Sequence, residues 1–351
     1  MTRDEFYQKV AKLIAEDAGV SAAMVESVTV ASIERRLSEG QFLDLTDVLP
    51  QMDRVEIDRV LSLMASAGVR FFAAISVNYS DDVLPDGLNK SKTVEPHQWW
   101  LALLREHFEN LTVLQSYQES DVSVANFGVS GAAMARIKGV RSSLVGSELR
   151  RLVNRAMLAT RIVSAMTVSR ERLFRELEGK TVALVGNARS LGSSSHGSLI
   201  DSHDIVVRFN RVPIVSRRSH GFRTDWIATG IPLDQSRLDN LGASRVLWMS
   251  PYRRKMTADT ILLRELYVHP VKEIHVLAEN ARVERPTTGL TAIELFRRST
   301  CRAVDLYGFD FYATQSSSSH QTIENAPHTF DREEAHVRQI LSKDKRFSLV
   351  L

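Results

Sequence analysis

The stretch that decides the fold is KTVALVGNARSLGSSSHGSLIDSHDIVVRFNRVP, residues 180–213. Its two apolar runs, VALV and IVV, predict two buried strands, and the polar residues between them predict a small-residue loop followed by a short helix. Asn187 comes directly after the first strand, and Asn210 stands near the end of the second. Open α/β sheets bind ligands at the carboxyl ends of their strands, so we expect these two amides to converge on one ligand.

The residues of this turn suit a nucleotide. An amide offers both a donor and an acceptor to ribose hydroxyls and base edges, while Gly186, Gly192 and the serine run allow the backbone to approach a ligand closely. The spacing fits neither the P-loop, because no Gly-Lys-Ser/Thr follows the strand, nor the dinucleotide pattern G-x-G-x-x-G. A tight connection that binds nothing is the alternative interpretation of the turn.

A second pattern is PTTGLTAIELFRRSTCRAVDLYGFDFY, residues 286–312. It predicts a helix that starts at Thr-Thr-Gly and a buried strand that ends at Gly308. The exposed amides of a helix start, with the hydroxyls of Thr287 and Thr288 beside them, form a site for a phosphate. In the alternative interpretation, Thr288 is only the N-cap of the helix.

A third pattern lies in the tail, HQTIENAPHTFDREEAHVRQIL, residues 320–341. His320 and His328 flank a loop, and Glu333 and Glu334 open the last predicted helix. Histidine is the side chain best suited to take a proton from a hydroxyl near neutral pH, and a carboxylate from the next helix could hold it in place. Most of the chain's ten histidines must nevertheless be structural.

The composition is that of a globular protein. The 351 residues are 44% hydrophobic and 25% charged, which is enough for two modest domains or one large one. The single cysteine, Cys301, allows no intrachain disulfide and favours a cytoplasmic location. No apolar stretch is long enough to cross a bilayer, so we expect neither a signal peptide nor a membrane span.

Residues 1–130 predict a separate, smaller α/β domain. Helical spacing covers residues 4–17, 21–39 and 55–67, and an apolar run predicts a strand over 69–77. The order of strands and helices resembles the C-terminal half of a class I methyltransferase. The glycine-rich turn that binds the methyltransferase cofactor has no counterpart here, so we expect a degenerate relative with a packing or partner role.

Residues 131–178 predict a basic helical linker. Between residues 133 and 175 there are ten Lys or Arg and only two Glu. This segment is either a solvated face of a connecting helix or a surface for an anionic partner, such as a lipid-linked glycan at a membrane or a phosphate-bearing acceptor. It lacks interleaved aromatics, so we expect no nucleic-acid partner.

In this order, the three patterns resemble the sialylmotifs of glycosyltransferase family 29, the sialyltransferases that use CMP-activated sugars. VALVGNARSL, LIDSHDIVVRFNRVP and GFRTD resemble the large motif, PTTG and CRAVDLYGF resemble the small motif, and His328 to Glu333 is similar to the very small motif, H-x-x-x-x-E. The resemblance covers residues 180–341. It implies that residues 179–351 form a catalytic domain with a Rossmann-like, GT-A-variant α/β fold.

The resemblance implies an inverting, metal-independent transferase that moves sialic acid, or the related 2-keto sugar acid Kdo, from a CMP donor to a glycan hydroxyl. The CMP-sugar is a substrate, and neither a cofactor nor a metal is expected. The implied catalytic residues are His328 as the general base, Glu333, and His320. The residues implied to bind the donor are Asn187 and Asn210 for CMP, Thr287, Thr288 and Gly289 for its phosphate, and Gly308 as part of the nucleotide site.

The sequence departs from the family pattern at three points. Cys301 matches the small-motif cysteine of vertebrate members, but Val182 stands where its disulfide partner would be. The aromatics that accompany the family's third motif are missing around His320. The interval from His320 to His328 is short, and the N-terminal half resembles no stem or membrane anchor of the family. We therefore expect a bacterial-type cytoplasmic enzyme that acts on a bacterial polysaccharide. The alternative is a non-catalytic CMP-binding or scaffolding protein in glycan assembly.

Overall fold

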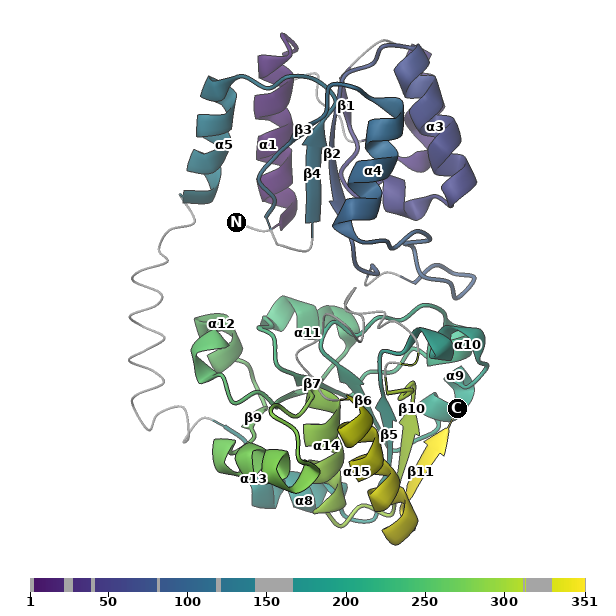
Figure 1. Ribbon diagram of the computed structural model, residues 1–351, viewed down its shortest axis with the longest axis vertical. Coiled ribbons are helices and arrows are strands. Elements are labelled where there is room, and N and C mark those ends of the chain that lie inside the picture. Colours follow the sequence, from purple (N-terminus) through teal and green to yellow (C-terminus); the bar gives the residue numbers. More distant parts are fainter. Residues whose placement is uncertain are drawn as a thin grey trace. The chain divides into compact units, whose positions relative to one another are not determined.

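The computed structural model describes residues 3–21, 28–38, 42–80, 83–117, 121–142, 167–311, 313 and 330–350. The chain forms two compact units, residues 1–80 with 90–147 and residues 81–89 with 148–351 (Figure 1). Both units combine helices with a sheet, which confirms the predicted α/β class. Among the described helices, none has the length and apolar character needed to span a bilayer.

The N-terminal unit contains a four-stranded sheet in the order β1-β2-β4-β3. β1 pairs in parallel with β2, and β4 runs antiparallel to both of its neighbours. The strands are β1 (Leu43–Asp44), β2 (Phe71–Ser76), β3 (Thr112–Val113) and β4 (Asp121–Ala125). The methyltransferase-like interpretation of this unit, and the predicted division into residues 1–130, 131–178 and 179–351, stay predictions.

The helices of this unit are α1 (Arg3–Asp17), α2 (Ile33–Ser38), α3 (Arg54–Ser66), α4 (His97–His107) and α5 (Gly131–Ser142). The helices predicted over 4–17 and 55–67 are therefore confirmed. The helix predicted over 21–39 is wrong over its described part. Thr29 is extended and forms a capping box with Ser32, so a 3₁₀ turn begins at Val30 and the α-helix only at Ile33.

The C-terminal unit is built on seven parallel strands in the order β11-β10-β5-β6-β7-β8-β9. β5 lies between β10 and β6, so the strands predicted from residues 180–213 and 286–312 are neighbours. Because all the strands are parallel, their carboxyl ends share one edge of the sheet. The strands are β5 (Thr181–Val185), β6 (Ile205–Phe209), β7 (Trp226–Thr229), β8 (Arg245–Trp248), β9 (Leu266–Val268), β10 (Ala303–Tyr307) and β11 (Phe347–Val350).

Helices cover both faces of this sheet. One apolar core joins the sheet to α8 (Arg170–Leu177), α13 (Val271–Ala281), α14 (Thr288–Arg297) and α15 (Phe330–Lys343). On the other face, smaller clusters take in α9 (Gly197–Asp201), α11 (Gln235–Leu241) and α12 (Ala258–Ile261). Further helical segments among the described residues are α10 (Arg217–His220) and the 3₁₀ turns η4 (Arg189–Ser193) and η5 (Arg253–Lys255) in this unit, and the 3₁₀ turn η3 (Leu49–Gln51) in the N-terminal unit.

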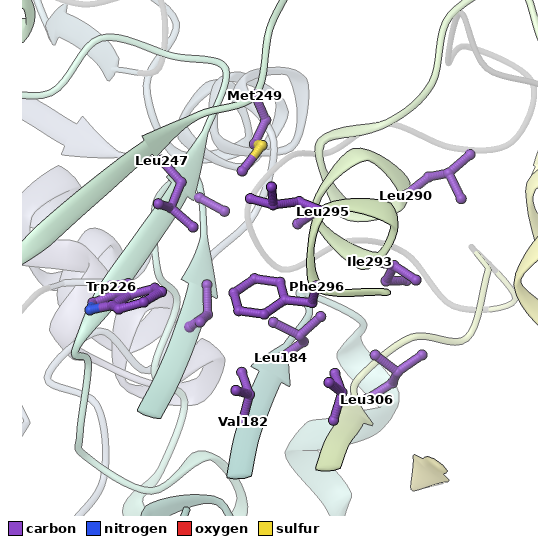
Figure 2. Packing of buried hydrophobic residues seen from close by; sticks show 14 of the residues in the cluster. Val182, Leu184, Trp226, Leu247, Met249, Leu290, Ile293, Leu295, Phe296 and Leu306 are labelled. Carbon is purple, nitrogen blue, oxygen red and sulfur yellow. The ribbon is translucent and has the colours of Figure 1, made fainter. Parts of the chain in front are cut away.

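Helix α14 is fixed to the sheet by its own apolar face. Phe296 is fully buried and points from α14 toward Trp226 of β7, with the two ring centroids 6.3 Å apart (Figure 2). Cys301 and Val182 are buried in the same core, and Cys301 is a free cysteine. Packing of this core therefore determines where α14 begins at the carboxyl edge of the sheet.

We predict that Phe296→Ala lowers the free energy of unfolding by about 3–5 kcal/mol, because it leaves a cavity between α14 and the sheet. The matched control is Phe222→Ala. Phe222 is 59% exposed, so this substitution should change the free energy of unfolding by less than about 0.5 kcal/mol. Urea unfolding followed by tryptophan fluorescence measures both. Equal effects of the two substitutions would contradict this account of the core.

Candidate active site

A cavity of about 460 Å³ lies at the carboxyl edge of the seven-stranded sheet. That volume is in the range of sites for small ligands. Its walls are the turns that follow β5, β6, β7, β8 and β10, together with the first residues of α14 and α15. The residues predicted to bind the donor all line it, namely Asn187, Asn210, Thr287, Thr288, Gly289 and Gly308, and so does Glu333.

Two asparagine amides connect successive turns of the sheet edge. The side-chain amide of Asn187 donates a hydrogen bond of 3.3 Å to the carbonyl of Phe209, at the end of β6. The side-chain oxygen of Asn210 accepts a hydrogen bond of 3.2 Å from the amide of Gly230, just after β7. Asn210 has a φ of +53°, a left-handed conformation that asparagine tolerates better than most residues. Each amide thus fixes its own turn against the next.

Glycines let the turns after β5 and β10 touch. The amide of Gly186 donates a hydrogen bond of 2.7 Å to the carbonyl of Tyr307. A Cβ atom on Gly186 would lie 2.4 Å from the carbonyl oxygen of Gly308, which itself has a φ of +64°. A Cβ atom on Gly289 would lie 3.0 Å from the ring of Phe309. The cavity floor therefore needs glycine at these positions because backbone and ring atoms occupy the space of a side chain.

Thr287 and Glu333 join the start of α14 to the first turn of α15. The backbone amide of Thr287 donates to one carboxylate oxygen of Glu333 at 2.8 Å, and its hydroxyl donates to the other at 2.6 Å. The same hydroxyl accepts a hydrogen bond of 3.1 Å from the amide of Leu290. Thr287, not Thr288, is therefore the N-cap of α14, and the alternative role considered for Thr288 is wrong.

These bonds leave part of the helix start open to a ligand. Among the described residues, nothing accepts a hydrogen bond from the backbone amide of Thr288 or Gly289. Both residues line the cavity, and amides in the first helical turn attract anions. These two amides are therefore available to an anionic ligand in the cavity.

Glu333 is 5% exposed, and its burial raises the pKa of its carboxyl from 4.5 to about 7, although the hydrogen bonds from Thr287 act in the opposite direction. The carboxyl thus changes charge near neutral pH while it holds the helix start. Its geometry fits a residue that positions Thr287. The predicted catalytic role of Glu333 stays a prediction.

Sequence reasoning missed the aromatic and cationic part of the wall. Phe309 directly follows Gly308 and packs edge-on against Phe209, with the ring centroids 5.6 Å apart. Lys255 and Arg285 also line the cavity. An aromatic residue just after a strand-ending glycine was a usable signal for Phe309, whereas the basic run that contains Lys255 is indistinguishable in sequence from a solvated turn.

His320 and His328 lie outside the described residues, so their predicted roles stay predictions. Phe330, two residues after His328 in the sequence, is buried and lines the cavity with Val337. Across the described part of the chain, no group of three or more His, Cys, Asp or Glu side chains is placed to hold a metal ion.

Fold and site together define an α/β protein with a ligand cavity at the carboxyl edge of a parallel sheet. Residues 145–229 match the family model described as glycosyltransferase family 29 (sialyltransferase). The match includes Asn187 and Asn210. It confirms the resemblance to this family and the expectation that the protein is a glycosyltransferase.

Two solved structures are also similar to this chain. One is a mammalian sialyltransferase in complex with Gal-beta-1-3GalNAc-ortho-nitrophenol, and the other is described as a mammalian sialyltransferase. Each is 20% identical in sequence, with a TM-score of 0.39 over 54% of this chain. The similarity covers 77% of the first chain and 76% of the second.

We predict that Glu333→Gln removes a pH dependence of stability. The carboxyl of Glu333 has a pKa of 4.5 in the unfolded chain and about 7 in the folded protein, so the folded protein keeps the proton up to a higher pH. The wild type should therefore lose about 3 kcal/mol of unfolding free energy as pH rises from about 4.5 to 7, at roughly 1.4 kcal/mol per pKa unit. Glutamine does not titrate and keeps one oxygen to accept from the backbone amide of Thr287, but its NH₂ group cannot accept from the Thr287 hydroxyl. The variant should therefore lose the pH dependence of stability between pH 5 and 8, from a starting stability lowered by the one lost hydrogen bond.

Urea unfolding at pH 5, 6, 7 and 8 measures this difference. Asp331→Asn, at an exposed position in the same helical turn, is the matched control and should keep the wild-type slope. A Glu333→Gln slope equal to that of the wild type would show that Glu333 does not titrate in this range.

We predict that Gly186→Ala disrupts the cavity floor. The new methyl group overlaps the carbonyl of Gly308, so the turns after β5 and β10 must separate, at a cost of about 1–3 kcal/mol in unfolding free energy. Gly192→Ala is the control in the neighbouring 3₁₀ turn, where the nearest atom, a methyl carbon of Val215, is 3.9 Å away. Calorimetry with CMP should show weaker binding only for Gly186→Ala. Unchanged CMP affinity would mean that the ligand does not depend on this contact.

Proposed function

We propose that this glycosyltransferase transfers a 2-keto sugar acid, either sialic acid or Kdo, from its CMP ester to a glycan hydroxyl, with inversion and without a metal ion. One observation carries the proposal. Three sequence segments that resemble sialylmotifs, 180–213, 286–312 and 328–333, each contribute described residues to a single cavity. The edge of a parallel sheet is also where a Rossmann-like, GT-A-variant enzyme would hold its nucleotide.

The donor would occupy the cavity from the centre of the sheet outward. The turns that contain Asn187, Asn210 and Gly308 would contact the cytidine, and the ring of Phe309 would offer an apolar surface to the base. The open amides of Thr288 and Gly289 would then receive the phosphate, with the Thr288 hydroxyl beside them. This arrangement is supported by the fact that all these residues line a single cavity.

In the reaction, the acceptor hydroxyl oxygen would attack the anomeric carbon from the face opposite the phosphate. The bond from that carbon to the phosphate oxygen breaks, and CMP leaves with both bonding electrons. His328 would take the proton of the acceptor hydroxyl, and the amides of the α14 start would stabilise the charge that develops on the phosphate. Glu333 would hold the α14 start in place through Thr287.

Metal independence is part of this proposal, because helix-terminal amides and hydroxyls supply the charge stabilisation in the scheme. We also propose a cytoplasmic location, a role in making a bacterial polysaccharide, and a lipid-linked or phosphate-bearing acceptor that contacts the basic segment 133–175. The support for this last contact is the excess of Lys and Arg in that segment.

We predict that His328→Ala lowers the rate of CMP release by about 10²- to 10⁴-fold, the usual cost of losing a general base, while CMP still binds. The assay follows CMP release from CMP-sialic acid and from CMP-Kdo, with a glycan acceptor and a metal chelator present. His275→Ala, at an exposed position on α13, is the control and should keep full activity. Equal turnover by wild type and His328→Ala would exclude His328 as the base.

The same assay separates the alternatives for the chain. Wild-type protein that binds CMP tightly but releases none from either donor would favour the non-catalytic scaffolding role. Activity that disappears with the chelator and returns with a divalent cation would overturn metal independence. The donor that is turned over identifies the sugar acid.

A further inference from the structure

We propose that Lys255 and Arg285 bind the carboxylate of the donor sugar and so select sugar acids over neutral sugars. This inference rests on the proposed function, because it concerns the sugar end of the same cavity. Five charged residues line the cavity, namely Arg211, Lys255, Arg285, Asp310 and Glu333. The interactions of these five side chains decide which of them can bind the carboxylate of the donor sugar, the second anionic group beside the phosphate.

The two acidic side chains have protein partners. Glu333 accepts both of its hydrogen bonds from Thr287, as described above. Asp310 accepts a hydrogen bond of 3.0 Å from the hydroxyl of Ser190, in the 3₁₀ turn after β5. Both carboxylates therefore accept hydrogen bonds from protein groups, and these bonds hold segments of the cavity wall together.

Two of the three basic residues, Lys255 and Arg285, contact the same aromatic ring, that of Tyr252. The guanidinium carbon of Arg285 lies 4.8 Å from the centroid of the Tyr252 ring, and the ammonium nitrogen of Lys255 lies 5.4 Å from it. The two charged groups are thus at most about 10 Å apart, although they come from different parts of the chain. Across the described residues, no carboxylate lies within 4 Å of the Lys255 ammonium. Both groups line the cavity, and two positive charges at one end of it favour an anionic ligand there.

The location of this pair matches the covalent structure of the donor. In a 2-keto sugar acid, the anomeric carbon carries both the phosphate and the carboxylate, so the carboxylate lies immediately beside the phosphate. Arg285 is two residues before Thr287, whose helix start provides the phosphate site. Lys255 belongs to η5, after β8, while the predicted nucleotide contacts follow β5, β6 and β10.

The sheet order gives the direction of the bound donor. Asn187 follows β5, Asn210 follows β6, and Gly230 follows β7, where an ideal Cβ would lie 3.4 Å from the Thr288 hydroxyl. Lys255 comes after the next strand, β8. A donor whose nucleoside lies over β5 and β6 and whose phosphate lies near β7 therefore places its sugar toward Lys255 and Arg285. A neutral sugar at this position would leave the Lys255 ammonium without an anionic group among the described residues and the ligand.

Binding measurements with matched ligands test the inference. The ligands are CMP, the slowly reacting donor analogue CMP-3-fluorosialic acid, and the methyl ester of that analogue, which lacks the carboxylate charge. The wild type should bind the acid about 10- to 100-fold more tightly than the ester, the range expected for hydrogen bonds to a charged group. Lys255→Met should reduce this preference at least fivefold and leave CMP affinity unchanged, and Lys255→Arg should restore it.

Arg254→Met is the matched control. Arg254 lies 5.8 Å from the same Tyr252 ring and is exposed, but it does not line the cavity. Its loss should change none of the three affinities, which separates direct contact from the general positive field. Lys255 is exposed, so its substitution should not disturb folding. An unchanged affinity for CMP shows that the Lys255→Met protein is folded.

The outcomes distinguish this inference from the proposed function. A wild type that binds CMP but does not prefer the acid to the ester would overturn the carboxylate site and leave the nucleotide site standing. Weaker CMP binding by Lys255→Met would assign the cation to the phosphate instead. A wild type that binds no CMP would overturn the proposed function, and the carboxylate site with it.

Discussion

The bonds between Thr287 and Glu333 connect two segments that are 46 residues apart in the sequence, and the geometry of the site depends on them. One carboxylate accepts from the backbone amide and from the hydroxyl of the residue that caps α14. The start of α14 is thereby held against the start of α15, while Phe296 holds the body of α14 on the sheet. The position of the open amides of Thr288 and Gly289 follows from these two attachments.

The turns after the strands of the seven-stranded sheet also line the cavity, and no disulfide joins the two motif segments, because Cys301 is free. Val182 stands where the resemblance implies a disulfide partner for Cys301, and both residues are buried in one apolar core. β5 and β10 pair directly, with Val182 opposite Val304 in the parallel register. Backbone hydrogen bonds and packing therefore hold the two segments together, and contact between Gly186 and Gly308 brings their turns within reach of one ligand.

Much of the site could be predicted because parallel strands end at a common edge. The positions of Asn187, Asn210 and Gly308 after apolar runs are enough to place them near one another. The N-cap could not be chosen from sequence, because Thr287 and Thr288 are equally suited to capping, and the choice depends on which of them meets Glu333. Lys255 and Arg285 escaped prediction because their shared contact, the ring of Tyr252, exists only in the folded chain. The overlong helix at 21–39 shows that periodicity alone misses a local cap such as that of Thr29.

The amides of Asn187 and Asn210 have a thermodynamic consequence. Each side chain is held by a hydrogen bond to a neighbouring turn, so its conformational entropy is lost when the protein folds and is not lost again when a ligand arrives. The cavity wall formed by these two turns is in this sense preorganised. The affinity of a ligand on this wall would therefore depend on the integrity of the sheet edge, and such a ligand would raise the melting temperature of the C-terminal unit by mass action.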